Sequence, residues 1–222
     1  MTESVGRRRV ATLGLGQEAA KRTLDVLVSL TAIIVLAPLM GLVWCLVRCT
    51  SVGPAVFRQE RLGRKKQPFT LMKFRTMYVK NNDQIHREYV TSLLSNEQPS
   101  AGGQRGLYKL EKDPRITPVG GWLRRSSLDE LPQLFNVLSG EMSLVGPRPV
   151  LPWEAQLFPE AYQRRFAVKP GITGLWQVSG RSRLSMRQAL QLDVEYVLRR
   201  SLAFDISILF RTVPALFRGG AL

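Results

Sequence analysis

The hydrophobic and polar positions divide the chain into a polar N-terminal stretch, one long apolar run and a mixed remainder. The apolar run lies between Asp25 and Arg48 and holds 22 consecutive residues without a formal charge. A helix of that length is long enough to cross a bilayer. Pro38 lies near the middle of the run, where a proline removes a backbone donor and favours a kink. The pattern therefore predicts a membrane-embedded helical segment that is interrupted at its centre.

Basic residues on both sides of this run bear on its topology. Lys21 and Arg22 precede it, and a second basic group follows it at Arg48, Arg58, Arg61, Arg64, Lys65 and Lys66. The positive-inside rule keeps both flanks on the cytoplasmic side, which a single spanning helix cannot satisfy. We therefore expect a re-entrant helix-break-helix hairpin over residues 21–50. A core helix of a soluble domain is the alternative, but the run is too long and too uniformly apolar for one.

The segments on either side of the hairpin complete the domain organisation. Residues 1–20 are basic and then small and glycine-containing, so we expect a flexible tail that either touches lipid headgroups or is simply disordered. This tail lacks the apolar core of a signal peptide. Residues 51–222 form a cytoplasmic, membrane-associated domain.

Several secondary-structure elements are predicted within residues 51–222. Alternating residues predict a short β-hairpin, with strands at Val56–Arg61 and Phe69–Met77 and a turn at Gly63. Apolar residues recur at helical spacing over four ranges, 82–94, 127–138, 186–200 and 202–217. In the second of these, the predicted inward positions are Leu131, Leu134, Phe135 and Leu138. The last helix is amphipathic, suited to lying in the headgroup plane or to packing on the domain. The predicted fold class is mixed α/β and mainly helical.

Composition narrows the choice of partners. Thirty-two Lys and Arg against 17 Asp and Glu give a net charge of +15, which predicts a polyanionic partner or surface. The chain shows neither a recognition helix nor the aromatic pattern of an RNA-binding sheet, so we expect anionic membrane lipids and no nucleic acid. Cys45 and Cys49 lie in the apolar run without metal-ligand partners. His86 is the single histidine, which excludes a histidine-based triad and a multi-histidine zinc site.

Residues 124–149 are the stretch richest in candidate chemistry. Asp129 and Glu130 are adjacent carboxylates flanked by arginines. On one helical turn two such side chains point about 100° apart, so they can reach one small site from two directions. An acidic pair among arginines suits a site where phosphate and a divalent cation meet. The alternative is an exposed acidic pair in the first turn of a helix, with Ser126 or Ser127 as its N-cap.

Four basic residues are candidates for binding phosphate: Lys73, Arg75, Arg124 and Arg148. Lys73 and Arg75 share one face of the second predicted strand, and two cations on one face fit phosphate binding. The alternative is an exposed basic strand beside anionic lipid. Arg148 lies between two prolines on an extended backbone and resembles a bidentate phosphate clamp.

Residues 127–149, which read SLDELPQLFNVLSGEMSLVGPRP, closely resemble the signature of the bacterial sugar transferases, the monotopic polyprenol-phosphate phosphoglycosyl transferases. Three further blocks agree in order and spacing, namely Phe69–Met77, Asp113–Thr117 and KPGITGLWQVSG at 169–180. The resemblance covers nearly the whole chain from about Lys21 and is to the short form of the family, which lacks the extra N-terminal membrane helices of larger relatives. The family's re-entrant helix is usually broken at a Ser-Pro pair. Here Ala37 replaces the serine before Pro38.

This resemblance implies a reaction and a set of roles. The enzyme would transfer a sugar 1-phosphate from a UDP-sugar, such as UDP-glucose or UDP-galactose, to undecaprenyl phosphate and release UMP, as the first membrane step of polysaccharide assembly. Asp129 would attack the β-phosphate to form a phosphosugar-aspartate intermediate, with Glu130 assisting and Mg²⁺ held near both carboxylates. A non-catalytic membrane scaffold of the same fold is the alternative, but it would be expected to have lost one of the two acids. The expected location is the cytoplasmic face of the bacterial inner membrane.

The remaining candidates concern the nucleotide sugar. Arg115, Gln177, Arg181 and Asp193 are candidate contacts to it, and Asp193 falls in a block similar to a second acidic block of the family. Trp176 could stack on uracil, or serve as an interfacial anchor or core residue. Residues 81–112 carry no assigned chemistry. The oligomeric state is left open, and a homo-oligomer is compatible with the sequence.

Overall fold

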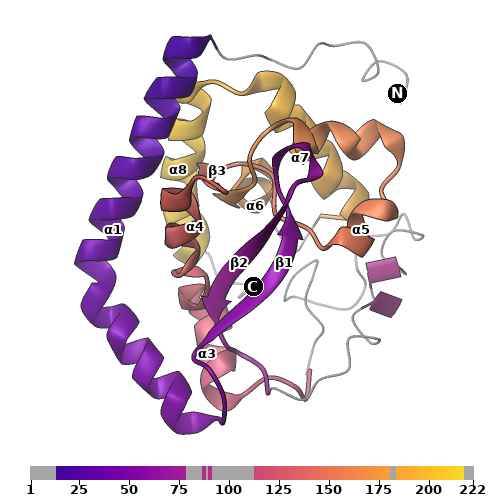
Figure 1. Cartoon of the computed structure of the whole chain (residues 1–222). Helices are drawn as coiled ribbons and strands as arrows, with labels where there is room; N and C mark the ends of the chain where they lie inside the picture. Colours follow the sequence, from indigo (N-terminus) through magenta and orange to yellow (C-terminus); the bar gives the residue numbers. More distant parts are fainter. Residues whose placement is uncertain (1–13, 79–86, 89, 92–112, 181–183, 218–222) are drawn as a thin grey trace.

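The computed structural model describes residues 14–78, 87–88, 90–91, 113–180 and 184–217. These residues form a mainly helical domain with two small sheets, and one long N-terminal helix lies along it (Figure 1). The predicted mixed, mainly helical class is therefore confirmed. Most of the helix predicted over 82–94 falls outside the described residues.

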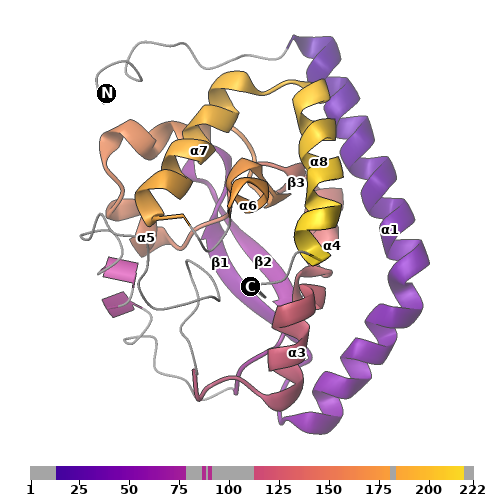
Figure 2. The same ribbon diagram turned by 180° about the vertical axis from the view of Figure 1, so that it is seen from behind.

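The apolar run lies in α1, a helix of 36 residues over Leu15–Thr50, so residues 15–20 of the predicted tail form its first turns. Pro38 lies inside α1 and does not end it, and the two helices of the predicted hairpin are one continuous helix. Figures 1 and 2 show α1 bowed around the domain, with its direction changing about halfway along. Bending lets a helix keep an internal proline, because the curvature relieves the clash between the ring and the preceding turn.

One side of α1 packs on the domain, and the other side is apolar and exposed. The buried residues are Asp25, Ser29, Val43 and Val47. The exposed large apolar side chains of its central and C-terminal parts are Leu27, Val28, Leu30, Ile34, Val35, Leu42, Trp44 and Leu46. By length and composition, α1 is the one helix in the described part of the chain that could cross a membrane. An apolar surface of this extent indicates contact with lipid or with another apolar surface.

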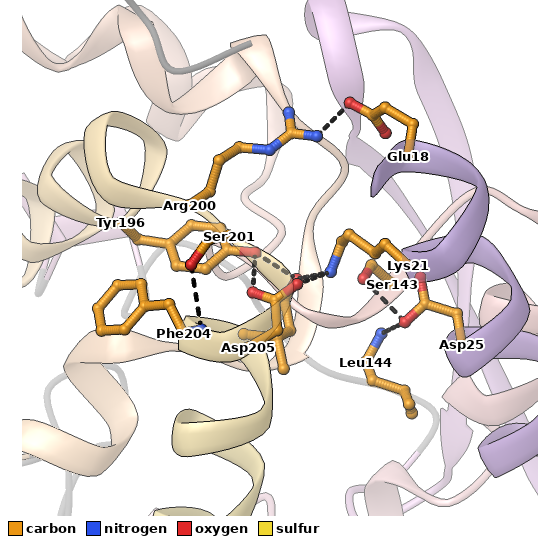
Figure 3. Close-up of polar contacts among 11 residues, drawn as sticks. Glu18, Lys21, Asp25, Ser143, Leu144, Tyr196, Arg200, Ser201, Phe204 and Asp205 are labelled. Atoms are coloured by element: carbon orange, nitrogen blue, oxygen red, sulfur yellow. Dashed lines mark hydrogen bonds and ion pairs between the residues drawn. The ribbon is translucent and has the colours of Figure 1, made fainter. Parts of the chain in front are cut away.

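Polar contacts attach the N-terminal half of α1 to the domain (Figure 3). The Lys21 ammonium donates to the Asp205 carboxylate at 2.5 Å and to the Val145 carbonyl at 3.3 Å. Asp25 accepts a hydrogen bond from the backbone amide of Leu144 at 3.0 Å. These partners come from segments more than 100 residues away in the chain, so the contacts fix the helix in the tertiary structure.

Arg75 attaches the other end of α1. Its guanidinium donates to the carbonyl oxygens of Pro54 and Ser51 at 2.6 and 2.7 Å, and to the Ser51 hydroxyl at 2.8 Å. Val47, near the end of the helix, is buried in one cluster with Phe74. Both ends of α1 are therefore held against the same domain.

The predicted β-hairpin is confirmed. β1 (Val56–Leu62) and β2 (Pro68–Phe74) pair antiparallel, with Phe57 opposite Lys73. The short 3₁₀ helix η2 (Arg64–Lys66) lies in the turn. The second strand ends three residues earlier than predicted, so its alternation does not extend to the residues that follow it.

Three short elements follow in the next described segment: α3 (Pro118–Ser126), the 3₁₀ turn η3 (Leu128–Glu130) and α4 (Gln133–Ser139). The hydroxyl of Thr117 caps α3 by accepting from a backbone amide of its first turn. Gly140, with a φ of +84°, ends α4 at the predicted position, because a left-handed residue suits a helix C-terminus.

The apolar stripe predicted for α4 is partly wrong. Leu134 is buried in the main core as expected, but Phe135 is exposed. Val137 takes the inward position instead, since it lies three residues after Leu134 and therefore on the same side of the helix.

The C-terminal half of the chain surrounds a second small sheet. β3 (Ser143–Val145) pairs in parallel with β4 (Gly171–Thr173). The remaining elements are α5 (Pro152–Gln156), η4 (Glu160–Ala167), α6 (Leu175–Ser179), α7 (Met186–Arg199) and α8 (Leu202–Phe217). The predicted helices over 186–200 and 202–217 are thus confirmed as α7 and α8.

Of the two placements predicted for the last helix, packing on the domain is confirmed. Ile208 is fully buried, and the hydroxyls of Thr212 and Thr173 are 2.8 Å apart. The other side of α8 exposes Phe210 and Val213. Figures 1 and 2 show α8 beside the N-terminal half of α1, so these two helices lie at one side of the molecule.

Candidate active site

Asp129 and Glu130 lie in the turn η3, between α3 and α4. α3 ends at Ser127, which has a left-handed φ of +58° and donates its N–H to the Leu123 carbonyl. The chain then makes one 3₁₀ turn, closed by the Glu130 amide on the Ser127 carbonyl, instead of entering α4 directly as predicted. Asp129 is 5% exposed and Glu130 is partly exposed. The aspartate is the more enclosed of the two carboxylates.

Three of the four predicted phosphate-binding residues surround this acidic pair. Arg148 Nη1 lies 3.8 Å from Glu130 Oε1. Burial lowers the pKa of Lys73 to about 8, and the charge of Asp129 opposes that shift. Burial also lowers the pKa of Arg124, again opposed by Asp129. Cations outnumber carboxylates here, so a bound phosphate group would relieve their mutual repulsion.

Arg148 is presented by a loop that packs backbone to backbone on its neighbour. A Cβ added at Gly146 would lie 2.5 Å from the Lys169 carbonyl oxygen, and one at Gly171 would lie 2.1 Å from the Gly146 nitrogen. The Gly171 amide donates to the Pro147 carbonyl at 2.9 Å. Larger residues at these two glycines would therefore displace the segment that carries Arg148.

Two of the predicted basic contacts are engaged with protein groups in the structure. The guanidinium of Arg75 is engaged at the C-terminal end of α1, as described above, and does not face the acidic pair. Arg115 forms a bidentate ion pair with Asp113, with Nε–Oδ1 and Nη2–Oδ2 distances of 2.8 and 2.7 Å. This ion pair borders the site, because both of its charges act on the pKa of Arg124.

The other candidate contacts to a nucleotide sugar are buried or undescribed. Gln177 and Trp176 are buried in α6, and Trp176 belongs to an apolar cluster, which is the core alternative of its prediction. Asp193 is 2% exposed and forms an ion pair with Arg165. Arg181 lies outside the described residues.

Nearly all of this chain matches a single family model. Residues 16–219 match the model of the bacterial sugar transferases. The chain belongs to this family. The resemblance seen in the sequence motifs is thereby confirmed, and so is the prediction that the protein is an enzyme, a phosphoglycosyl transferase.

Individual relatives of this sugar transferase fall into a short and a long group. The exopolysaccharide production protein ExoY of Sinorhizobium fredii is 43% identical over 197 residues, which is 88% of this chain and 84% of the relative. The undecaprenyl-phosphate galactose phosphotransferase of Salmonella typhimurium is 42% identical over 89% of this chain and 40% of its own length. The UDP-glucose:undecaprenyl-phosphate glucose-1-phosphate transferase of Escherichia coli is 37% identical over 87% of this chain and 39% of its own length.

The acidic pair of this sugar transferase can be tested for its fit to Mg²⁺. Among the described residues, no group of three or more His, Cys, Asp or Glu side chains is arranged to hold a metal ion. Asp129 and Glu130 offer two neighbouring carboxylates. Mg²⁺ at phosphate-transfer sites is commonly bound by one or two carboxylates, with substrate phosphates and water completing its shell. The donor set therefore fits a Mg²⁺ that binds together with a diphosphate substrate.

Asn136 has a role in this sugar transferase that the apolar pattern does not reveal. Its side chain is buried, donates to the Thr70 carbonyl at 2.7 Å and accepts from the Met72 amide at 3.0 Å. The amide thus completes the second edge of β2 as another strand would, and fixes α4 against the residue before Lys73. The only sequence signal is a poor helix former inside a helix.

Proposed function

We propose that this sugar transferase moves a sugar 1-phosphate from a UDP-hexose to undecaprenyl phosphate and releases UMP. The names of the Salmonella and Escherichia relatives, which specify galactose and glucose 1-phosphate, support this substrate class. The observation that carries the proposal is the enclosed carboxylate of Asp129 in the electrostatic range of Lys73 and Arg124. Cations placed in this way stabilise charge on phosphate oxygens during group transfer.

In the first step, a carboxylate oxygen of Asp129 forms a bond to the β-phosphorus of the UDP-sugar. The bond from that phosphorus to the bridging oxygen breaks, and UMP leaves with the electron pair. Arg148, held near Glu130, binds the diphosphate as charge moves onto the leaving group. The product on the enzyme is a mixed anhydride of the aspartate and the sugar phosphate, which is a good onward donor.

In the second step, an oxygen of undecaprenyl phosphate attacks the same phosphorus, and the carboxylate of Asp129 leaves unchanged. Lys73 and Arg124 bind the lipid phosphate and offset the repulsion between the two phosphate groups. Bound Mg²⁺ would supply further charge neutralisation to the donor diphosphate, with Asp129 and Glu130 as its protein ligands.

The enzyme is assigned to the cytoplasmic face of the bacterial inner membrane as a monotopic protein. Lys21 and Arg75 hold opposite ends of α1 on one domain, whereas the ends of a spanning helix are separated by about 30 Å of hydrocarbon. A bowed α1 that enters and leaves one leaflet on its exposed apolar side is compatible with both contacts. The net charge of +15 favours a surface of anionic lipids.

The decisive experiment supplies the purified protein in lipid discs with undecaprenyl phosphate and a panel of UDP-sugars, and measures UMP. We expect UMP release and a lipid-linked sugar diphosphate with at least one UDP-hexose. A small burst of UMP without the lipid acceptor is expected as well, because the first step needs only the donor. Absence of turnover with every donor in the panel would refute the proposed function. Release strictly dependent on both substrates would favour direct displacement instead.

A further inference from the structure

A buried ion pair adjoins Arg148 and has no part in the steps above. Arg165, in η4, and Asp193, in α7, are each 2% exposed, and Arg165 Nη2 lies 2.6 Å from Asp193 Oδ2. The same nitrogen donates to the backbone carbonyl of Arg148 at 2.7 Å. The pair therefore contacts the main chain of the residue whose side chain faces Glu130.

Ion pairing alone does not offset the burial of these two charges. Within the described part of the chain, Arg165 Nε and Nη1 and Asp193 Oδ1 are buried without a hydrogen-bond partner. The Arg165 guanidinium lies 5.1 and 5.7 Å from the ring centroids of Phe158 and Phe166, which attract a cation but accept no strong hydrogen bond. A buried pair with unused donors and acceptors costs more desolvation than its attraction returns. Stability therefore does not explain why the pair is present.

The hydrogen bond from Arg165 to the Arg148 carbonyl explains why the buried ion pair is present. Pro147 and Pro149 leave the segment with few amide donors of its own. The Arg165 contact holds the main chain at the one residue between them. With its backbone held there, Arg148 directs its guanidinium to 3.8 Å from Glu130.

We propose that Arg165 and Asp193 are positioning residues that fix the backbone of Arg148 for catalysis. Asp193 orients Arg165, Arg165 holds the Arg148 carbonyl, and Arg148 then meets the acidic pair and the donor diphosphate. Asp193 acts through these two arginines and does not touch the nucleotide sugar. The last link, to the diphosphate, rests on the proposed function, whereas the fixing of the backbone does not.

Two variants separate these links. Arg165→Lys keeps a cation beside Asp193, but the shorter side chain cannot reach both of the oxygens that Nη2 holds. Arg165→Met combined with Asp193→Asn removes both charges and keeps the approximate volumes. The matched control is Arg199→Met combined with Glu195→Gln, which removes an exposed ion pair from the same helix, α7.

The first measurement is amide hydrogen exchange, which needs no substrate. We expect both pair variants to exchange faster in peptides that cover residues 143–151, with the core helices unchanged, and the control to match the unaltered protein. If the double variant unfolds and exchanges throughout, the exchange of residues 143–151 in Arg165→Lys tests the proposal. Unchanged exchange of residues 143–151 in a folded variant would refute the proposal, whatever reaction the protein catalyses.

The second measurement is a mutant cycle with Arg148→Ala, read as kcat/KM for the UDP-sugar. Misplacement of a binding group by about 1 Å can cost about 100-fold, so we expect a loss of about 10- to 100-fold for the pair variants and less than about 2-fold for the control. In the Arg148→Ala background the pair variants should cause almost no further loss, because their effect passes through Arg148. If the pair variants lower kcat/KM by the same factor in the Arg148→Ala background as in the unaltered enzyme, the pair does not act through Arg148. Absence of turnover in the unaltered enzyme counts against the proposed function, and hydrogen exchange then decides the positioning role alone.

Discussion

Asp129 and Glu130 are adjacent in the chain, yet their surroundings differ, which supports the different roles proposed for them. Asp129 is nearly enclosed and lies in the field of Lys73 and Arg124, which stabilise negative charge on its oxygens. Glu130 is partly exposed and faces Arg148 at 3.8 Å. An enclosed carboxylate among cations suits attack on phosphorus, whereas an accessible one paired with arginine suits the holding of metal or diphosphate.

Amide substitutions should separate the two carboxylates. Asp129→Asn keeps the shape but removes the proposed nucleophile, so we expect turnover to fall to background. Glu130→Gln removes an assisting charge, and electrostatic contributions of that kind are commonly worth about 10² to 10³ in kcat. A slow but measurable enzyme is therefore expected. Steady-state UMP release, measured for both variants at saturating donor, checks the difference.

Mass spectrometry gives the corresponding control for the nucleophile. With UDP-sugar and no lipid acceptor, the peptide that contains Asp129 should gain the mass of one sugar phosphate, and undecaprenyl phosphate should remove it. The adduct should be absent from Asp129→Asn and present in Glu130→Gln. An unmodified peptide under single-turnover conditions in the active enzyme would count against the covalent route.

The lowered pKa of Lys73 predicts a loss of activity at alkaline pH. Lys73 is the cation whose charge is lost as the pH rises through about 8, well below the usual range of a lysine. Its attraction for the lipid phosphate disappears with that charge, so kcat/KM for undecaprenyl phosphate should decline above pH 8. Lys73→Arg keeps the charge at every pH in this range. Profiles from pH 7 to 9 for the two proteins should diverge, and parallel profiles would place the titrating group elsewhere.

Some residues of the site could be predicted from the sequence and others could not, for physical reasons. The acidic pair and Arg148 lie in a motif with unusual neighbours, and Lys73 was selected for its charge and its face of the predicted second strand. The direction of the Arg75 side chain was predicted wrongly because β2 ends at Phe74. The alternation of a strand therefore does not apply to the next residue. Arg165 was missed because it forms its ion pair with a residue 28 positions away, a distance that no local pattern reports.

At the scale of elements, the site depends on how α4 and β2 are joined. Asn136 makes that joint through the backbone groups of Thr70 and Met72. Lys73 directly follows Met72 in β2, and the turn that carries Asp129 directly precedes α4. The joint between β2 and α4 therefore sets the position of Lys73 relative to Asp129. A side chain that only binds backbone can therefore control the distance between two groups of the site.

Asn136→Leu tests this joint. The substitution keeps the approximate volume but removes the side-chain partner of the Met72 amide and of the Thr70 carbonyl, two part-buried hydrogen bonds worth about 1 kcal/mol each. We expect the free energy of unfolding to fall by about 2 kcal/mol, measured by denaturant unfolding in detergent. Ser139→Ala removes an exposed hydroxyl from the same helix, together with its bonds to the Asn136 carbonyl and to Glu141, and leaves the bonds of Asn136 to β2 in place. It should change the free energy of unfolding by about 1 kcal/mol or less. Equal effects of the two substitutions would show that the joint contributes little.

Length and regularity decided which elements could be predicted. The β-hairpin, α7 and α8 each repeat their pattern over several residues, and all three are found. β3 and β4 have three residues each and were not predicted, because three residues show no recognisable period. The break at Ala37 and Pro38 was predicted from the cost of an internal proline, but one lost hydrogen bond does not end a helix that can bend.

At the scale of the molecule, the position of α1 relates the membrane to the site. At about 1.5 Å per residue its 36 residues extend about 54 Å along the bow, longer than a hydrocarbon core of about 30 Å. Contacts from Lys21 and Arg75 return both ends to the domain, so the length is used to follow the domain surface. In the proposed monotopic arrangement, the exposed apolar side of α1 would face lipid and the domain would stay on one side of the membrane.

Thiol labelling tests this topology. In a protein without its two exposed cysteines, Cys45 and Cys49, single cysteines are placed at two exposed positions. Gln17 lies near the N-terminal end of α1, and Gln67 lies in the domain that follows α1 in the chain. An impermeant thiol reagent should modify neither position in intact cells and both in inverted membrane vesicles, because both ends are held on the cytoplasmic domain. A third cysteine at Ile34, on the exposed apolar side, should resist the reagent in both preparations and react once the membrane is dissolved in denaturant. Modification of Gln17→Cys from outside the cell and of Gln67→Cys only from inside would establish a spanning helix. In that case the contacts of Lys21 and Arg75 could not both exist in the membrane, and the monotopic assignment would be abandoned.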